Sequence, residues 1–166
     1  NHYIQPLGFP FDDEGKLAAA GKVNLVLLDA LNNLEFYNLK QPKSLGLEWV
    51  KKKVIPLIDT YKLETKDILK TFVEHIAIQI SKVLTKKENA TVFITGGGAF
   101  NTYLISRIKA WSSNNEIVMP SNDIINYKEA LVFGLLGVLK MRNEVNCLSS
   151  VTGAKHDHSS GKIYLP

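Results

Sequence analysis

The chain has 166 residues, 45% of them hydrophobic and 22% charged, which excludes a disordered or fibrous protein and fits about one domain. Its formal net charge is +4, but the lysine clusters at 51–53 and 86–87 are separate and lack interleaved aromatic residues, so we expect no nucleic-acid binding. A single cysteine, Cys147, excludes a disulfide framework, and no signal peptide or apolar run of ~20 residues is recognisable, so we expect a soluble, cytoplasmic protein without a membrane segment.

Residues 1–15 combine two prolines and two glycines with aromatic side chains, which predicts a loop after the end of an element that starts before residue 1. The acidic residues 12–14 could form a metal site, but a DDEG sequence is more typical of a solvated turn or a helix cap. From 16 to 34, apolar residues recur at helical spacing around Gly21. This pattern predicts one or two helices with a break or a close contact at the glycine.

The sequence QPKSLG at 41–46 predicts a turn before a helix that starts near Leu47. Residues 48–58 continue this short amphipathic helix, and Pro56 should weaken its end. Lys43 in the turn could reach a phosphate, although a solvated lysine is the interpretation that its spacing favours.

Thr65–Leu84 is the strongest predicted helix, because its apolar residues form one broad stripe at helical spacing. Thr65 can cap its N-terminus. His75 lies in the middle of the helix. No second histidine or carboxylate stands at metal spacing on the same face, so we expect a histidine at the edge of the core rather than a ligand.

The stretch at 91–101, TVFITGGGAFN, predicts a buried strand at 92–94, a tight glycine turn and the start of a helix. Amides that open the helix would then point unpaired above the turn, which favours an anionic ligand such as a nucleotide phosphate. The stretch is neither a P-loop nor a dinucleotide fingerprint. A close-packed corner between strand and helix therefore remains the alternative.

Two strands flank the next helix. Residues 101–110 have helical spacing, and 116–119 read as a second short strand stopped by Pro120. A strand, helix and strand at this spacing form a βαβ unit, whose strands are parallel. Ligands of such sheets bind at the carboxyl ends of the strands, where 96–98 and 120–123 both fall.

The last quarter of the chain begins with a helix at 128–141 that is apolar or small over almost its whole surface, so we expect it to be buried. Glu129 near its start either contacts a ligand or complements the helix dipole. His156, Asp157 and His158 look like metal ligands, but their surroundings favour a flexible, exposed loop. Residues 162–165 predict an edge strand.

Five segments in order resemble the C-terminal portion of the anhydro-N-acetylmuramic acid kinase family, bacterial sugar kinases of the superfamily that includes actin, hexokinase and the heat-shock chaperone ATPases. They are FDDEGKLAAAG at 11–21, QPKSLGLEW at 41–49, FITGGGAFN at 93–101, YKEALVFGLLG at 127–137 and SVTGA at 150–154. The resemblance implies an α/β fold, helix-rich with a short parallel sheet, that forms part of the second lobe of an actin-like (ribonuclease H-like) ATPase.

The resemblance also implies an ATP- and Mg²⁺-dependent kinase that hydrolyses the 1,6-anhydro bond of anhydro-N-acetylmuramic acid and phosphorylates O6, giving N-acetylmuramic acid 6-phosphate in peptidoglycan recycling. It assigns nucleotide contacts to Gly96, Gly97, Gly98 and Ala99 and a sugar contact to Glu129. Lys43, Ser44 and Asn101 are further cleft residues on this pattern.

The general-base aspartate and the first lobe of this family lie upstream of residue 1, so the resemblance assigns no catalytic residue and no metal ligand to this chain. We therefore expect a piece of the second lobe that is inactive alone. Exposed apolar faces would make it pair with the missing half, form a homodimer or be marginally stable. Two alternatives are a nucleotide-binding module without kinase activity and a helical interaction domain in which the glycines only form a corner.

Overall fold

The computed structural model describes residues 1–40, 43–85 and 89–164. They form two compact units, Asn1–Met119 and Pro120–Pro166, which we describe separately. Parts of the predicted turn at 41–46 and strand at 162–165 lie outside the described residues, as does the lysine pair at 86–87. No helix of the described part is long and apolar enough to cross a membrane.

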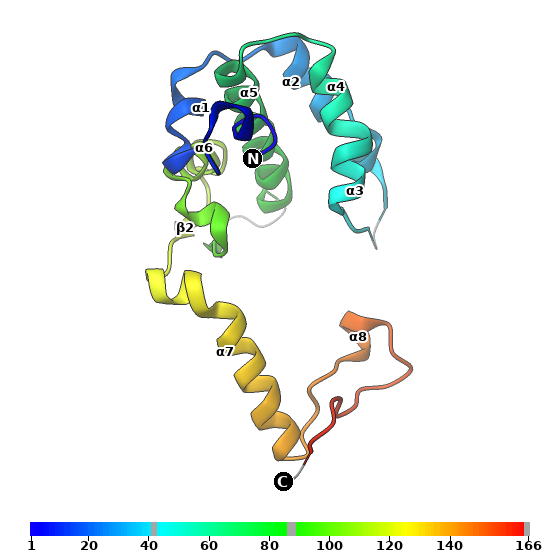
Figure 1. The fold of residues 1–166 in the computed structure, drawn as a ribbon. Helices are drawn as coiled ribbons and strands as arrows, with labels where there is room; N and C mark the ends of the chain where they lie inside the picture. The colour runs from blue at the N-terminus through cyan, green and yellow to red at the C-terminus, as the bar shows by residue number, and fades with distance from the viewer. Residues whose placement is uncertain (41–42, 86–88, 165–166) are drawn as a thin grey trace. The chain divides into compact units, whose positions relative to one another are not determined.

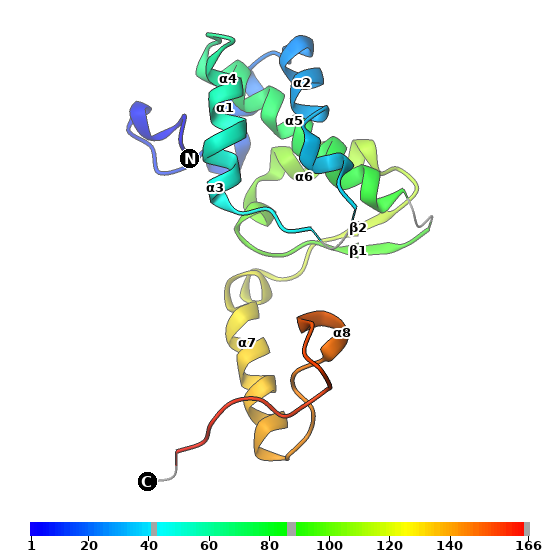
Figure 2. The ribbon, with the colours of Figure 1, turned by 90° about the vertical axis from the view of Figure 1, so that its right-hand side faces the viewer.

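The first unit contains helices and a short parallel sheet (Figures 1 and 2). Its elements are α1 (Lys16–Ala20), α2 (Leu25–Asn32), α3 (Leu47–Trp49), α4 (Ile55–Asp59), α5 (Thr65–Leu84), β1 (Thr91–Phe93), α6 (Thr102–Trp111) and β2 (Glu116–Val118). The second unit contains α7 (Asn122–Met141) and α8 (Ser149–Thr152). The expectation of a helix-rich α/β chain with a short parallel sheet is thus confirmed.

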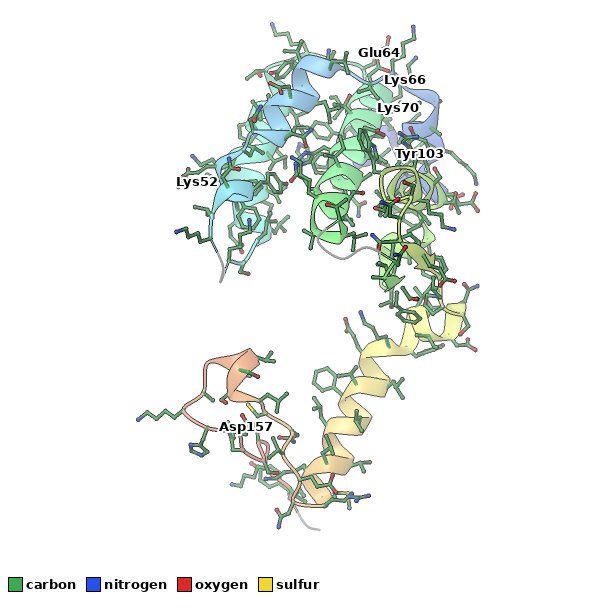
Figure 3. The ribbon with its side chains drawn as sticks, turned by 180° about the vertical axis from the view of Figure 1, so that it is seen from behind. Lys52, Glu64, Lys66, Lys70, Tyr103 and Asp157 are labelled. Atoms are coloured by element: carbon green, nitrogen blue, oxygen red, sulfur yellow. The ribbon has the colours of Figure 1, made fainter. Side chains whose placement is uncertain are left out.

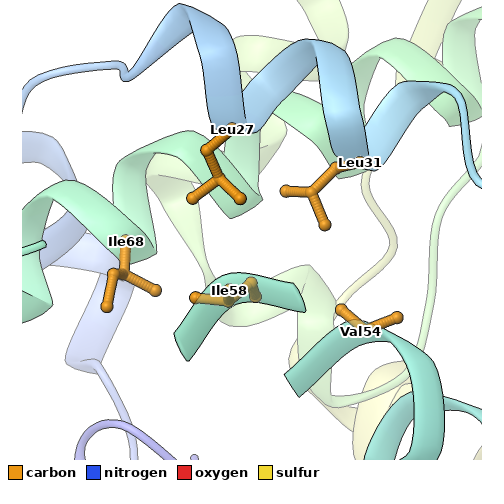
Figure 4. Packing of buried hydrophobic residues seen from close by; sticks show 5 residues of the cluster. All are labelled: Leu27, Leu31, Val54, Ile58 and Ile68. Atoms are coloured by element: carbon orange, nitrogen blue, oxygen red, sulfur yellow. The ribbon is translucent and has the colours of Figure 1, made fainter. Parts of the chain in front are cut away.

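Helix α5 is the centre of the first unit and has the predicted bounds. Glu64 precedes it at the N-cap, and no side chain caps it, so the prediction that Thr65 is the cap is wrong. Its apolar stripe meets α2 and α4 in a core of five buried side chains, shown in Figure 4: Leu27, Leu31, Val54, Ile58 and Ile68. Burying one such side chain contributes about 1.5–3 kcal/mol, so this core holds the helices together.

Gly21 separates α1 from α2 and is also a close contact, as predicted. A Cβ at this position would lie 2.1 Å from the carbonyl oxygen of Lys66 in α5. Beyond it, the Asn24 side chain caps α2 by accepting a hydrogen bond from the Leu27 amide at 2.9 Å. The chain therefore turns tightly against α5 before the second helix begins.

The helical segment that starts at Leu47 continues through Pro56 to Asp59, one residue beyond the predicted end. Residues Val50–Val54 form a π-helical turn, in which the Ile55 amide bonds the carbonyl of Val50. A proline lacks an amide hydrogen and disrupts a regular α-helix. The wider turn directly before Pro56 lets the helix accommodate it.

Strands β1 and β2 are parallel, as predicted, with Val92 opposite Ile117. Helices α5 and α6 pack against each other through a second core of Ala77, Ile105 and Ile108. Ile94 packs against this core, whereas Phe93 is 54% exposed, which contradicts the expected burial of this side chain. Neighbouring side chains of a strand point to opposite faces, and the helices cover only one of them.

In the second unit, α7 begins at Asn122, six residues earlier than predicted, and the Ser121 side chain caps it. Its apolar side chains Leu131, Phe133 and Met141 are 68%, 71% and 80% exposed, so the predicted burial of this helix is wrong. An all-round apolar helix requires a covering partner. In the described part of the chain, these side chains are not covered.

Candidate functional site

The glycine turn, residues 96–100, connects β1 to α6. Gly96 has a φ of +91°, which favours glycine, and the following residues form a single 3₁₀ turn. A Cβ added at Gly97 or Gly98 would meet no heavy atom within 4 Å in the described part of the chain. Close packing of strand against helix therefore does not require glycine at these two positions, and space for a ligand lies above them.

Hydrogen bonds occupy some of the amides in the turn. The Ala99 amide bonds the Gly96 carbonyl at 2.9 Å, and the Asn101 side chain accepts from the Leu104 amide at 2.9 Å. The prediction of unpaired amides is therefore wrong for Ala99 and Leu104. Among the described residues, the amides of Gly97 and Gly98 donate to no protein acceptor. These two amides are available to an anion.

The glycine turn borders a pocket of about 520 Å³, which we name the glycine pocket. Gly97, Gly98 and Asn101 line it on one side. Its opposite walls come from the acidic turn at 12–15 and from apolar residues of α5 such as Phe72. Its volume lies within the range of small-molecule sites, and its lining is mainly apolar with a few polar groups, as such sites usually are.

The two turns of this pocket are fixed to each other although 88 residues separate them. The Thr102 hydroxyl donates to the carbonyl oxygen of Glu14 at 3.1 Å. Gly15 has a φ of +78°, and a Cβ there would lie 2.3 Å from Oδ1 of Asn101. Asn101 thus both caps α6 and closes the wall of the glycine pocket. Glycine at position 15 is required by backbone conformation and by space.

The acidic residues of the turn are already engaged. Both carboxylate oxygens of Asp12 accept backbone amides, from Leu17 at 2.8 Å and from Ala18 at 2.9 Å. Asp13 pairs with Lys16. The interpretation as a turn and helix cap therefore holds. Among the described residues, no cluster of three or more potential metal ligands occurs.

Lys43 and Ser44, which were expected to be cleft residues, do not line the glycine pocket. Lys43 and Ser44 line a second pocket of about 540 Å³, which shares no residue with the glycine pocket. The Lys43 ammonium group donates to the carbonyls of Phe36 at 3.0 Å and Tyr37 at 3.1 Å. The structure thus brings Asn101 together with the glycines but leaves Lys43 and Ser44 apart from them.

Glu129 belongs to the second unit, where its side chain is exposed. Because α7 begins at Asn122, Glu129 lies in the third helical turn, and Asp123 is the acidic residue of the first turn. The helix-dipole interpretation of Glu129 is therefore wrong, since that interaction is confined to the first turn. The other interpretation of Glu129, that it contacts a ligand, stays a prediction.

The tail residues that look like metal ligands have structural roles. The carboxylate of Asp157, which Figure 3 labels, accepts from the Ser149 amide at 2.7 Å and from its hydroxyl at 2.6 Å, and these bonds lower the pKa of Asp157. Cys147 and His158 form an antiparallel bridge through two backbone hydrogen bonds of 3.1 Å. The expected flexible loop is therefore held by hydrogen bonds. Residues 162–164 form no strand, so the predicted edge strand is wrong there.

One buried carboxylate, that of Glu74, was not singled out from the sequence. Glu74 of α5 accepts two bonds from Arg107 of α6, at 2.7 and 2.8 Å, and one from Trp111 at 2.6 Å. Arg107 is the main cause of the lowered pKa of Glu74. The helical spacing of the sequence places Glu74 on α5. Its partners Arg107 and Trp111 belong to α6, so only the packing of α5 against α6 brings them to it.

His75 was expected at the edge of the core, and it is fully buried. It is 1% exposed and is held between Asn32, 2.8 Å from Nδ1, and the Tyr37 hydroxyl, 2.8 Å from Nε2. Burial lowers its pKa from 6.5 to about 4, with a smaller contribution from Lys82. The imidazole is therefore neutral at pH 7.

Comparison with known proteins places these features in a family context. A family model described as anhydro-N-acetylmuramic acid kinase matches residues 3–166. A protein of that name from Gamma-proteobacterium EBAC31A08 is 36% identical over 143 residues, 83% of this chain and 38% of the relative. One from Sulfurovum sp. (strain NBC37-1) is 31% identical over 160 residues, 93% of this chain and 44% of the relative.

A third relative of the same name, from Xanthomonas oryzae pv. oryzae (strain MAFF 311018), is 32% identical over 168 residues, 95% of this chain and 43% of the relative. The chain therefore spans less than half the length of the curated relatives that it matches. These proteins contain a further part that has no counterpart in the 166 residues.

Proposed function

The chain belongs to the anhydro-N-acetylmuramic acid kinase family, and from this premise we propose that it is part of an ATP-dependent sugar kinase. In the proposed reaction, water gives a proton to the catalytic base and attacks the anomeric carbon of anhydro-N-acetylmuramic acid. The bond between that carbon and O6 breaks, and O6 takes the γ-phosphoryl group of ATP, which releases ADP. The product is N-acetylmuramic acid 6-phosphate, an intermediate of peptidoglycan recycling. We also propose that the chain forms part of the second lobe of an actin-like fold.

The glycine turn is the proposed nucleotide site of this chain. The single observation that carries the proposal is the open space above Gly97 and Gly98, where glycine is not needed for packing and two amides have no acceptor among the described residues. Such amides can donate to phosphate oxygens. The apolar wall around Phe72 and Leu104 offers a surface for the base or ribose of the nucleotide.

The catalytic base of the proposed reaction comes from outside this chain. Such a base must reach the attacking water by a hydrogen bond. Asp12, a carboxylate of the glycine pocket, uses both oxygens to cap α1. We propose that the remaining part of the kinase supplies the base and the other half of the cleft, and that Glu129 contacts the sugar in the assembled enzyme.

Nucleotide binding tests this assignment without requiring turnover. We would measure the affinity of the intact chain and of Gly97→Ala for ATP by calorimetry, together with thermal unfolding of both. The added methyl group meets no heavy atom of the described residues within 4 Å, so the unfolding temperature should stay within about 2 °C. It projects toward the ligand, so the affinity should fall at least about tenfold.

Gly134→Ala is the matched control, because among the described residues a Cβ at Gly134 also meets no heavy atom within 4 Å outside the backbone of its own helix. It should leave the affinity for ATP unchanged. Equal affinities of the chain and Gly97→Ala would contradict the nucleotide site. Complete absence of ATP binding would favour a helical interaction domain in which the glycines only form a corner.

A further inference from the structure

The pocket of about 540 Å³ that contains Lys43 has the composition of a separate binding site. We name it the lysine pocket. The side chains that matter to its chemistry are Phe36, Lys40, Lys43, Ser44, Trp49 and Lys53. It lies between the single turn of 3₁₀ helix at Glu35–Asn38 and the helix that starts with α3, on the first unit. Its volume suits a ligand of small-molecule size.

One wall of the lysine pocket is aromatic and fixed in place. The rings of Phe36 and Trp49 have their centroids 5.3 Å apart, and Trp49 packs against the main hydrophobic core. The Tyr37 ring contacts both of them edge-on, at 5.6 and 6.4 Å. Trp49 therefore offers a rigid aromatic surface on which a planar or pyranose ring can pack without ordering the wall first.

The rim of the lysine pocket is basic. It carries Lys40, Lys43 and Lys53 against a single acidic residue, Glu35. In the described part of the chain, none of the three lysines pairs with a carboxylate. Uncompensated positive charge around a concave surface attracts an anion.

Lys43 is the most ordered of these cations. Its ammonium group is held by two carbonyl oxygens and lies 4.9 Å from the centroid of the Phe36 ring. An ammonium group has three donors, so one is left for a ligand. The Ser44 side chain lines the same pocket and adds a hydroxyl group. The charge is thus presented at a fixed position beside the aromatic wall.

We propose that the lysine pocket binds an organic anion in which a phosphate or carboxylate group is attached to a ring the size of a sugar or a purine. The anionic group lies at the lysines, and the ring packs on Trp49. Because this pocket shares no residue with the glycine pocket, the assignment is independent of the proposed function. Two sources fit this chemistry, a nucleotide and an acidic sugar.

Calorimetry on the intact chain separates these sources. The probes are AMP, a phosphate on a nucleoside, and N-acetylmuramic acid, a carboxylate on a sugar. Adenosine and N-acetylglucosamine are their uncharged counterparts. We expect saturable binding of at least one anion, weaker at high salt, and at least about tenfold weaker binding of its uncharged counterpart.

Lys53→Gln and Lys52→Gln form a matched pair of variants. Both lysines are exposed and neighbours in one helical turn, and both substitutions remove one positive charge, but only Lys53 lines the pocket (Figure 3 labels Lys52). Lys53→Gln should weaken binding of the anion about three- to tenfold, whereas Lys52→Gln should change it less than about twofold.

Three results would overturn the proposal: no saturable binding of either anion up to about 10 mM, equally tight binding of the uncharged counterparts, or equal effects of the two lysine variants. Binding measurements on Gly97→Ala distinguish AMP bound in the lysine pocket from AMP bound at the glycine turn. AMP binding that is lost in Gly97→Ala but unchanged in Lys53→Gln belongs to the glycine pocket, and the lysine pocket is then supported only by N-acetylmuramic acid.

Discussion

Protonation of His75 should destabilise the first unit as the pH falls from 6.5 toward 4. Its Nδ1 faces Oδ1 of Asn32, which also accepts from the Gln79 side chain at 2.7 Å, so Nδ1 carries the hydrogen. Nε2 then accepts from the Tyr37 hydroxyl. A second proton on the ring would take this acceptor away and place a charge in the core. Both effects disfavour the imidazolium form in the folded state.

The magnitude follows from the pKa of His75, which is 6.5 unperturbed and about 4 in the fold. Because the folded value is depressed, this contribution to stability is fully present above pH 6.5 and is lost as the pH falls toward 4. Each pH unit in that window costs up to about 1.4 kcal/mol. The total is about 3 kcal/mol, a substantial part of the stability of a small domain.

Urea denaturation at pH 7, 6, 5 and 4.5 measures this loss, with His75→Gln as the control that does not titrate. The free energy of unfolding of the unmodified chain should fall more steeply with decreasing pH than that of the variant. Coincident pH profiles would refute the reasoning. If His75→Gln does not fold, an NMR titration decides instead, and a pKa of His75 near 6.5 would refute it equally.

Two further tests, the first with a control variant, probe the packing around α5. Glu74→Gln should destabilise the fold by about 3 kcal/mol, because it leaves the Arg107 guanidinium without its buried carboxylate. Glu64→Gln breaks an exposed ion pair and should cost less than about 1 kcal/mol, so equal urea midpoints of the two variants would contradict this role of burial. Gly21→Ala should lower the unfolding temperature by several degrees, because its Cβ would overlap the Lys66 carbonyl; an unchanged value would refute the close contact.

Local sequence patterns predicted the elements better than their environments. The bounds of α5 follow from a 20-residue apolar stripe, which is long enough to outweigh local signals. The same kind of pattern in α7 showed that this helix requires a covering partner, but not that the described residues would leave Phe133 71% exposed. The spacing of apolar residues shows which face of a helix must be buried. It does not show which other segment packs on that face, because this depends on tertiary contacts.

In the candidate site, too, the local features could be predicted from the sequence and the contacts between distant segments could not. The glycine turn, its position after β1 and the capping of α6 by Asn101 are local features that the sequence contains. The contact of Gly15 with Asn101, the wall provided by α5, and the separation of Lys43 from the glycines depend on packing between distant segments. No local pattern encodes those distances, so the pocket itself could not be predicted.

The central claim is that this chain contributes a nucleotide site at the glycine turn but lacks the catalytic base. Phosphorus NMR of ATP and Mg²⁺ with anhydro-N-acetylmuramic acid and the intact chain tests both parts in one experiment. We expect that the ATP resonances shift or broaden, that Gly97→Ala diminishes the effect, and that no sugar phosphate appears. Unperturbed ATP resonances, or a growing sugar-phosphate resonance with the chain alone, would contradict this claim.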